Sequence, residues 1–185
     1  ADRAIERADV VVLLIDAVDG VTAQDAHIGG MIAEARKGAI IAVNKWDLVD
    51  KEAQSFDAYV EQVRGELKFL DFAPVVTLSA LTGQRATKVL DLAREVDAAR
   101  KTRVATGELN RFILELQTGH SFSRKGRELK FRYVTQVDIE PPTFIFFVNE
   151  PDLVHFATER MLANRLRERY GFVGTPLKLI FRESS

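Results

Sequence analysis

The stretch Ala39-Ile40-Ile41-Ala42-Val43-Asn44-Lys45-Trp46-Asp47 joins an apolar run to a polar tetrapeptide. A continuous apolar run of this kind is typical of a strand that is covered on both faces, as in a parallel sheet. The tetrapeptide Asn44-Lys45-Trp46-Asp47 follows the carboxyl end of that strand, which is where ligands bind in open α/β sheets. The stretch therefore predicts an α/β fold with a binding loop after a buried strand.

The pattern Asn-Lys-X-Asp is typical of a loop that recognises guanine. Guanine presents two adjacent donors, N1–H and the N2 amino group, and the ionised carboxylate of Asp47 can accept both at once. Adenine lacks both donors and would leave this carboxylate without a partner. Asn44 can hold the loop together and reach the Hoogsteen edge, while the methylene stem of Lys45 can cover the base plane. The alternative interpretation is a strand-to-helix loop in which Asp47 caps the helix, because short motifs also occur by chance.

A second loop has the position that a shared site requires. The run Val75-Val76-Thr77-Leu78 predicts a further strand, and Ser79-Ala80-Leu81-Thr82-Gly83 follows it. Because the carboxyl ends of neighbouring parallel strands lie at one edge of the sheet, the two loops can meet at one ligand. The backbone N–H of Ala80 could then donate to guanine O6. The pair of loops favours a guanine site over a chance match of the first motif.

The first hundred residues alternate strands with helices. Apolar runs predict strands over 10–15, 39–43 and 74–78. Thr22 with Asp25 has the spacing of a capping box for the first intervening helix, and Ser55 can cap the second. A third helix is expected over 84–100, with Leu90 and Val96 among its inward residues. This order predicts three right-handed strand–helix units and a parallel sheet, the architecture of part of a P-loop-type GTPase domain.

The pattern changes near residue 103, where we place a domain boundary between 1–102 and 103–185. The second part predicts a short helix around 109–116, an antiparallel hairpin over 129–139 and 143–148, a helix over 152–170 and a last strand over 177–181. The order α-β-β-α-β indicates a small α+β domain. Gly171-Phe172-Val173-Gly174 lies between the last helix and strand and is interpreted as a helix stop and turn.

Composition excludes several classes of protein. The 185 residues contain no cysteine, so disulfides, thiolate metal sites and a cysteine nucleophile are excluded. No apolar run reaches the roughly 18 residues of a membrane span, so no membrane association is expected. The three histidines are scattered, and no metal site of the chain's own is predicted. Residues 1–101 contain 13 Lys and Arg against 17 Asp and Glu, whereas residues 102–185 contain 13 against 10, which gives weak support to an anionic partner for the second part.

Residues 120–132 interleave basic and aromatic side chains. This composition is typical of a nucleic-acid surface, in which charges meet phosphates and rings stack on bases. The candidate RNA-binding residues are Arg124, Lys125 and Arg127. The alternative is a solvated loop that leads into an ordinary hairpin strand.

Several segments together resemble the EngA, or Der, family of bacterial tandem GTPases, which have two GTPase domains followed by a KH-like domain. These segments are residues 21–25, 44–47 with Trp at the third position, 79–83, 141–144, 164–167 and 174–182. The resemblance implies the second half of the second GTPase domain followed by the KH-like domain. It also implies GTP or GDP as ligand, Asn44, Lys45 and Asp47 as base-specificity residues, and Ser79 and Ala80 as their supporting loop.

The same resemblance implies a cytoplasmic protein that acts in assembly of the large ribosomal subunit. Its partners would be ribosomal RNA or that subunit, and the KH-like domain would pack against upstream GTPase domains of the same protein. The alternative function is an RNA- or ribosome-binding module without nucleotide-dependent activity.

One part of an intact GTPase is missing from the sequence. There is no G-x-x-x-x-G-K-[ST] phosphate loop and no D-x-x-G element. In the family that the chain resembles, these elements precede residue 1, and the ligands of Mg²⁺ belong to the intact domain. Because phosphate anchoring supplies most of the positioning and charge stabilisation, this chain alone is expected to hydrolyse GTP negligibly and to contain no catalytic residue.

Overall fold

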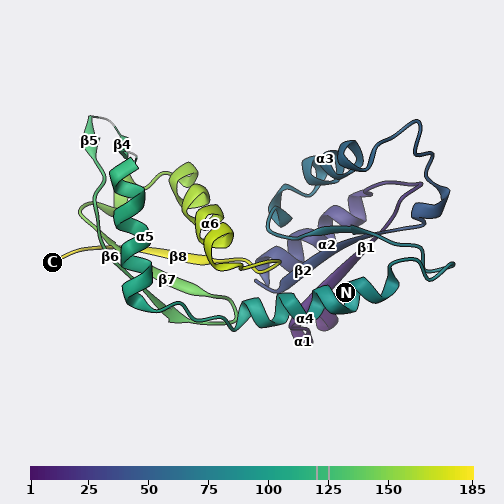
Figure 1. Cartoon of the computed structure of the whole chain (residues 1–185), viewed down its shortest axis with the longest axis horizontal. Helices are drawn as coiled ribbons and strands as arrows, with labels where there is room; N and C mark the ends of the chain where they lie inside the picture. The colour runs from purple at the N-terminus through teal and green to yellow at the C-terminus, as the bar shows by residue number, and fades with distance from the viewer. Residues whose placement is uncertain (120, 125) are drawn as a thin grey trace. The chain divides into compact units, whose positions relative to one another are not determined.

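The computed structural model describes residues 1–119, 121–124 and 126–185, with the backbone only at Arg124 (Figure 1). The chain divides into two compact units, the first comprising residues 1–99 and 173–176 and the second residues 100–172 and 177–185. The sequence suggested a division close to this point, but it gave no sign that four residues from the last quarter of the chain belong to the first unit. No helix in the described part of the chain is long and apolar enough to cross a membrane.

The first unit is a parallel sheet with helices between its strands. Its elements are α1 (Asp2–Arg7), β1 (Val10–Asp16), α2 (Ala23–Glu34), β2 (Gly38–Asn44), the 3-10 helix η1 (Trp46–Leu48), α3 (Phe56–Glu66), the 3-10 helix η2 (Lys68–Leu70), β3 (Val75–Thr77) and α4 (Ala86–Arg100). The strand order is β1-β2-β3, and both pairs are parallel. The predicted strand–helix units and their parallel sheet are therefore confirmed.

Strand β2 lies at the centre because its sequence is apolar on both faces. All five of its residues from Ala39 to Val43 are fully buried. Ala39, Ile41 and Val43 share one cluster with Ile32 of α2 and Val63 of α3, so these two helices cover one face of the sheet. The buried central strand fixes the position of the loop that leaves its carboxyl end.

The helix starts follow the predicted caps, and one inward residue differs from its prediction. Thr22 and Asp25 form a reciprocal capping box on α2, and the Ser55 side chain accepts a hydrogen bond from Ala58 N at the start of α3. On α4, Val96 is fully buried, whereas Leu90 is 64% exposed. The prediction that Leu90 faces inward is therefore wrong, because only the last turns of α4 are buried.

The second unit has the predicted α-β-β-α-β order. Its main elements are α5 (Thr106–Gly119), β6 (Phe131–Asp138), β7 (Thr143–Val148), the 3-10 helix η3 (Pro151–Leu153), α6 (Phe156–Tyr170) and β8 (Lys178–Glu183). Strands β6 and β7 pair antiparallel, and β7 and β8 pair parallel. Both helices lie on one side of this sheet (Figure 1), where Phe112 of α5 and Leu162 of α6 share a core with Phe144 and Phe146.

Two details of the second unit were not predicted. A short hairpin, β4 (Ser123–Arg124) with β5 (Arg127–Glu128), lies in the stretch of residues 120–132 that interleaves basic and aromatic side chains. The last helix begins at Phe156 rather than 152, because His155 provides the cap by accepting a hydrogen bond from Ala157 N at its Nδ1 atom. The predicted hairpin of β6 and β7 and the last strand are confirmed.

The segment Gly171–Pro176 connects α6 to β8 by way of the first unit. Gly171 ends α6 with φ 72°, so the predicted helix stop is confirmed. Gly174, with φ 66°, accepts a hydrogen bond at its carbonyl from Ala39 N at the start of the central strand, at 2.8 Å. Thr175 is fully buried. The turn is thus also a packing element of the parallel-sheet unit.

Candidate functional site

The loops after β2 and β3 are joined by hydrogen bonds. Trp46 N donates to Leu78 O at 3.1 Å, and Ala80 N donates to Asn44 Oδ1 at 2.9 Å. These bonds follow from the parallel pairing of β2 with β3, which places both carboxyl ends at one edge. The two loops that the sequence predicts as one site therefore lie side by side.

The Ala80 N–H has a different partner from the one expected. The sequence predicts guanine O6 as the acceptor for this donor, whereas in the structure the N–H donates to the Asn44 side chain. Asn44 is the last residue of β2, so its amide reaches the neighbouring loop directly. The expected role of Asn44 in holding the loops together agrees with this bond, and an O6 atom would have to share or replace the Asn44 oxygen at Ala80.

Asp47 lies exposed in the 3-10 helix η1. Within the described residues, no hydrogen bond or ion pair engages its carboxylate. The alternative in which Asp47 caps a helix is not what the structure has, because the following helix α3 is capped by Ser55. Both carboxylate oxygens are thus available to a pair of external donors.

Ser79 supports the second loop from inside. Its side chain is fully buried, and its Oγ accepts a hydrogen bond from Thr82 N at 3.2 Å. Ser79 N also donates to Gln84 O, which closes the turn. These bonds fix the backbone on both sides of Ala80, so the orientation of its N–H is set by the protein.

Lys45 forms an ion pair with Asp16, the last residue of β1. Lys45 has a left-handed backbone, with φ 61°, and its Nζ lies 2.5 Å from Asp16 Oδ2. The hydrogen bond from Lys45 lowers the pKa of Asp16, with help from the backbone N–H of Val18. The same pair raises the pKa of Lys45. Both groups therefore stay ionised at neutral pH, and the pair is lost as the pH falls through the lowered pKa of Asp16.

The ion pair of Lys45 with Asp16 follows from the alignment of the carboxyl ends of β1 and β2. Asp16 is the last residue of β1 and lies opposite Asn44 in the parallel register. Lys45 is the next residue after Asn44, so its side chain can return across the strand ends to the acid. Asp16 also stabilises the turn after β1, since its Oδ1 accepts a hydrogen bond from Val18 N at 2.8 Å.

Trp46 anchors the first loop in the core. It is 6% exposed and makes edge-on ring contacts with Tyr59, at 5.3 Å between centroids, and with Phe56, at 6.1 Å. The Tyr59 hydroxyl donates to Ala17 O at 3.1 Å. Because Trp46 is held inward, the residues on either side of it, Lys45 and Asp47, project outward.

We expect Asn44→Ala to loosen the second loop without unfolding the unit. The substitution removes one partly exposed hydrogen bond to Ala80 N, which is worth about 1 kcal/mol. Amide hydrogen exchange at Ala80 should therefore become roughly fivefold faster, while exchange in the buried strand β2 stays the same. Unchanged exchange at Ala80 would show that the bond does not hold the loops together.

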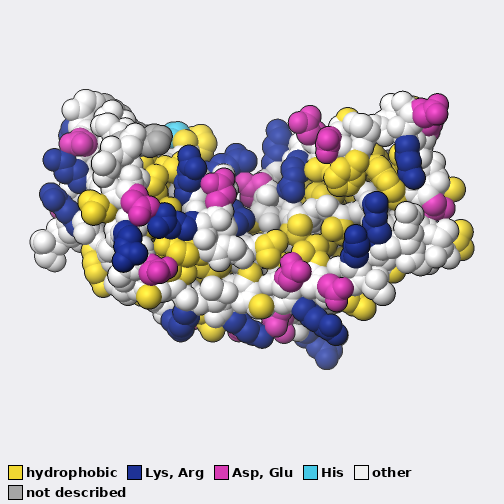
Figure 2. All heavy atoms as spheres, in the orientation of Figure 1, with side chains coloured by type: hydrophobic (Ala, Val, Ile, Leu, Met, Phe, Trp, Pro, Cys, Tyr) yellow, Lys and Arg dark blue, Asp and Glu magenta, His cyan; other side chains and the backbone are white. Residues whose placement is uncertain are grey.

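Only part of the candidate RNA segment can be placed. Lys125 and the side chain of Arg124 lie outside the described residues. Arg127 forms an ion pair with Glu150, and Lys130 lies 3.3 Å from Glu128. On the face shown in Figure 2, Lys and Arg side chains alternate with Asp and Glu. The described basic residues of this segment are thus partly neutralised by neighbouring acids.

A parallel sheet whose two adjacent carboxyl-end loops place an Asn-Lys-X-Asp motif beside a Ser-Ala turn defines the class of GTP-binding domains. Residues 1–98 match the family described as the elongation factor Tu GTP binding domain. Residues 103–182 match the family described as the KH-domain-like region of EngA bacterial GTPase enzymes, at their carboxyl terminus. The chain therefore belongs to the EngA, or Der, family of bacterial GTPases.

Curated relatives agree with this assignment. The chain is 52% identical over 182 residues to a protein named GTPase Der from Chloroflexus aggregans, and 48% identical over 184 residues to the one from Halothermothrix orenii. The two matches include 97% and 99% of this chain but only 40% and 42% of the two relatives. Among solved structures, Aquifex aeolicus Era bound to GDP and AlF4⁻ matches at 16% identity over 97% of this chain and 66% of that chain, with a TM-score of 0.40.

Proposed function

We propose that this chain contains the guanine-recognition half of a GTPase and that Asp47 accepts hydrogen bonds from N1–H and the N2 amino group of the base. The observation that supports the proposal most directly is the 2.9 Å hydrogen bond from Ala80 N to Asn44 Oδ1. It joins the two loops next to the exposed carboxylate of Asp47, which has no partner among the residues that the structure describes. A charge-assisted bidentate pair at Asp47 gives guanine the advantage over adenine. Asn44, Ser79 and Ala80 hold the two loops in position, and the methylene stem of Lys45 covers the base plane.

The phosphates and Mg²⁺ need other residues. The sequence contains neither the glycine-rich phosphate loop nor a D-x-x-G element. We propose that the elements that bind the phosphates and Mg²⁺ come from the remainder of the protein, since the chain spans about two fifths of the length of its relatives. The chain by itself should then hydrolyse GTP negligibly, because phosphate contacts supply most of the charge stabilisation in phosphoryl transfer.

We expect the whole protein to bind GDP at least about 10³-fold more tightly than ADP, since adenine leaves Asp47 without its two donors. Isothermal titration calorimetry of the whole protein with both nucleotides measures this ratio. The 185-residue chain should bind GDP far more weakly than the whole protein does. Equal affinity for GDP and ADP would exclude a guanine-specific site at these loops.

RNA binding in the second unit is a second proposal, and its support is the KH-like family of residues 103–182 together with the basic segment. A KH domain usually clamps nucleotides with a G-x-x-G loop between two helices. The Gly171–Gly174 string lies instead between α6 and β8, and Gly174 packs against Ala39. Contacts to RNA would therefore come from other surfaces. We propose that this RNA is ribosomal and that the protein acts in the cytoplasm, in assembly of the large ribosomal subunit.

We expect replacement of Arg124, Lys125 and Arg127 by Ala to weaken RNA binding and flatten its salt dependence. Each lost phosphate contact lowers the slope of log affinity against log salt by roughly 0.7 to 0.9. Because Arg127 already pairs with Glu150, the total change should be nearer two contacts than three. Filter binding of a ribosomal RNA fragment over a salt series measures the slope, and an unchanged slope would exclude this segment from the RNA surface.

A further inference from the structure

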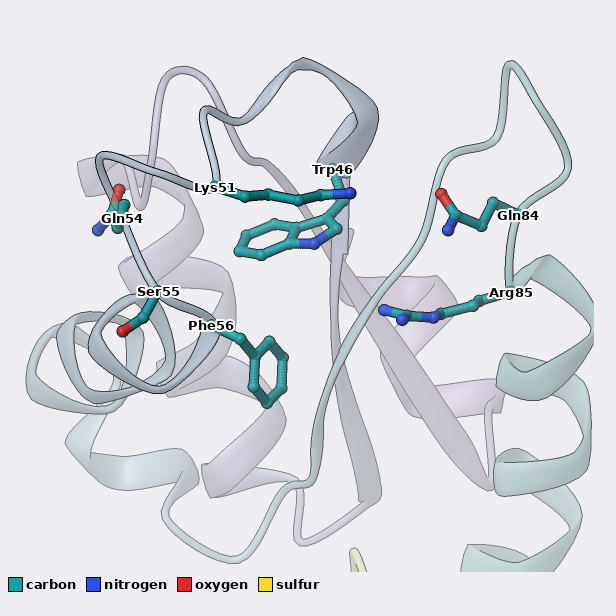
Figure 3. A pocket seen from close by; sticks show the side chains of 7 residues that line it. All are labelled: Trp46, Lys51, Gln54, Ser55, Phe56, Gln84 and Arg85. Carbon is teal, nitrogen blue, oxygen red and sulfur yellow. The ribbon is translucent and has the colours of Figure 1, made fainter.

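A cavity lies behind the base-specificity loop, on the side that Trp46 faces. Its volume is about 510 Å³, within the range of small-molecule sites. Figure 3 shows its lining, which comes from the loop after β2, the start of α3 and the turn before α4. The lining residues are Trp46, Lys51, Gln54, Ser55, Phe56, Gln84 and Arg85. The cavity is separate from the proposed base site, because Asp47 and Ala80 do not line it.

The charge of the lining has one sign. Lys51 and Arg85 are both cationic, and no Asp or Glu is among the lining residues. Neither cation has an ion-pair partner within the part of the chain that the structure describes. Two unpaired cations at one cavity attract an anion.

The Arg85 guanidinium is held in place at the cavity. Its Nη1 donates to Thr77 Oγ1 at 2.6 Å, and its backbone has φ 60°. Figure 3 shows the side chain extended toward the space between Trp46 and Gln84. A guanidinium has five N–H donors, so the others remain available for a bidentate contact with an oxyanion.

The opposite side of the cavity is aromatic. Phe56 is 45% exposed although it is the first residue of α3 and contacts the Trp46 ring edge-on. In Figure 3 the Lys51 side chain runs along the Trp46 indole, with Phe56 below it. An exposed ring at this position can pack against a planar ligand, a contact worth about 0.5 to 1.5 kcal/mol beyond burial.

We propose that this cavity binds a small anion that contains an aromatic ring, with the ring against Phe56 and its phosphate or carboxylate group at Arg85 and Lys51. The two halves of the lining match the two halves of such a ligand. A simple inorganic anion would leave Phe56 unused, and a neutral ring would leave both cations unused. The proposal does not depend on guanine recognition, because it uses none of the residues assigned to the base.

Trp46 is the only tryptophan in the sequence, so its fluorescence reports on this cavity. Titration of the 185-residue chain with phenyl phosphate, benzoate and inorganic phosphate should give a saturable change for the first two. Their dissociation constants are expected below about 1 mM, with inorganic phosphate at least about tenfold weaker. The stronger of the two aromatic ligands identifies the preferred oxyanion.

Charge-removing variants locate the site. Arg85→Gln and Lys51→Gln should each weaken phenyl phosphate about threefold, as expected for exposed charge pairs, and the double variant about tenfold. Lys68→Gln removes an exposed lysine elsewhere in the same unit and should change nothing. Phe56→Ala should remove the preference for phenyl phosphate over inorganic phosphate.

Three results would overturn the proposal. The first is the lack of a saturable change with either aromatic anion at about tenfold the expected dissociation constant. The second is equal affinity for phenyl phosphate and inorganic phosphate. The third is an equal loss in the Lys68→Gln variant. Circular dichroism of each variant separates these results from misfolding, and GDP affinity of the whole protein tests the proposed function independently.

Discussion

Asp47→Asn is expected to lower the affinity of the whole protein for GDP by about 10³-fold or more and to raise its affinity for xanthosine diphosphate. The carboxylate accepts from two donors on guanine, and the amide would place its own NH₂ group against one of them. Xanthine has a carbonyl where guanine has the amino group, so it can accept from that NH₂. The effect is large because the amide NH₂ of the variant and the N2 amino group of guanine are both donors, so neither has an acceptor when guanine is bound.

Calorimetry with GDP and with xanthosine diphosphate, on the natural protein and on the Asp47→Asn variant, measures this change of preference. Asp57→Asn is a matched control, because Asp57 is also an exposed acid near the start of α3 and lies outside the proposed base site. It should bind both nucleotides as the natural protein does. Unchanged GDP affinity in Asp47→Asn would remove Asp47 from the site, whatever the two loops do.

The position of the candidate site could be predicted because it depends on a few strong patterns. Two apolar runs separated by a helix become neighbouring parallel strands, and their carboxyl ends then lie at one edge. The structure has β2 and β3 in this arrangement, and the loops are joined by the bond from Ala80 N to Asn44. No detail of side-chain packing was needed for this inference.

The partners of individual groups in the loops could not be predicted in the same way. The pairing of Lys45 with Asp16 depends on the register of β1 against β2, which aligns Asp16 with Asn44. The occupation of Ala80 N by Asn44 depends on a side-chain conformation. Sequence patterns predict the faces and order of strands, whereas one-residue alignments between separate strands come from packing as a whole.

The contact of Gly174 with Ala39, which are far apart in the sequence, was also not predicted. Gly171-Phe172-Val173-Gly174 predicts a helix stop and a turn from local rules alone, and that prediction holds at Gly171. Local rules give no sign that Val173–Pro176 packs in a unit whose other residues end at Ala99. The glycine at the point of contact is consistent with close approach of two backbones, but its partner lies more than a hundred residues earlier in the sequence.

Gly174→Ala is expected to destabilise the first unit by about 2 to 5 kcal/mol, the sum of left-handed backbone strain and overpacking. Gly174 has φ 66°, and a Cβ added there would lie 2.4 Å from Val96 Cγ2 and 3.2 Å from Ala39 O. Val96 is fully buried and branched at Cβ, so its methyl groups cannot turn away easily. Relief would require a shift of either α4 or the central strand.

Gly171→Ala separates the two causes. Gly171 has nearly the same backbone, with φ 72°, but a Cβ added there meets nothing within 4 Å. Its cost should therefore be the strain alone, about 1 to 2 kcal/mol. Urea unfolding followed by far-ultraviolet circular dichroism, to which helices of both units contribute, measures both variants. Equal losses for the two would mean that the Val173–Pro176 segment is not packed against Val96 and Ala39, whereas a larger loss for Gly174→Ala would identify this segment as part of the core of the GTP-binding unit.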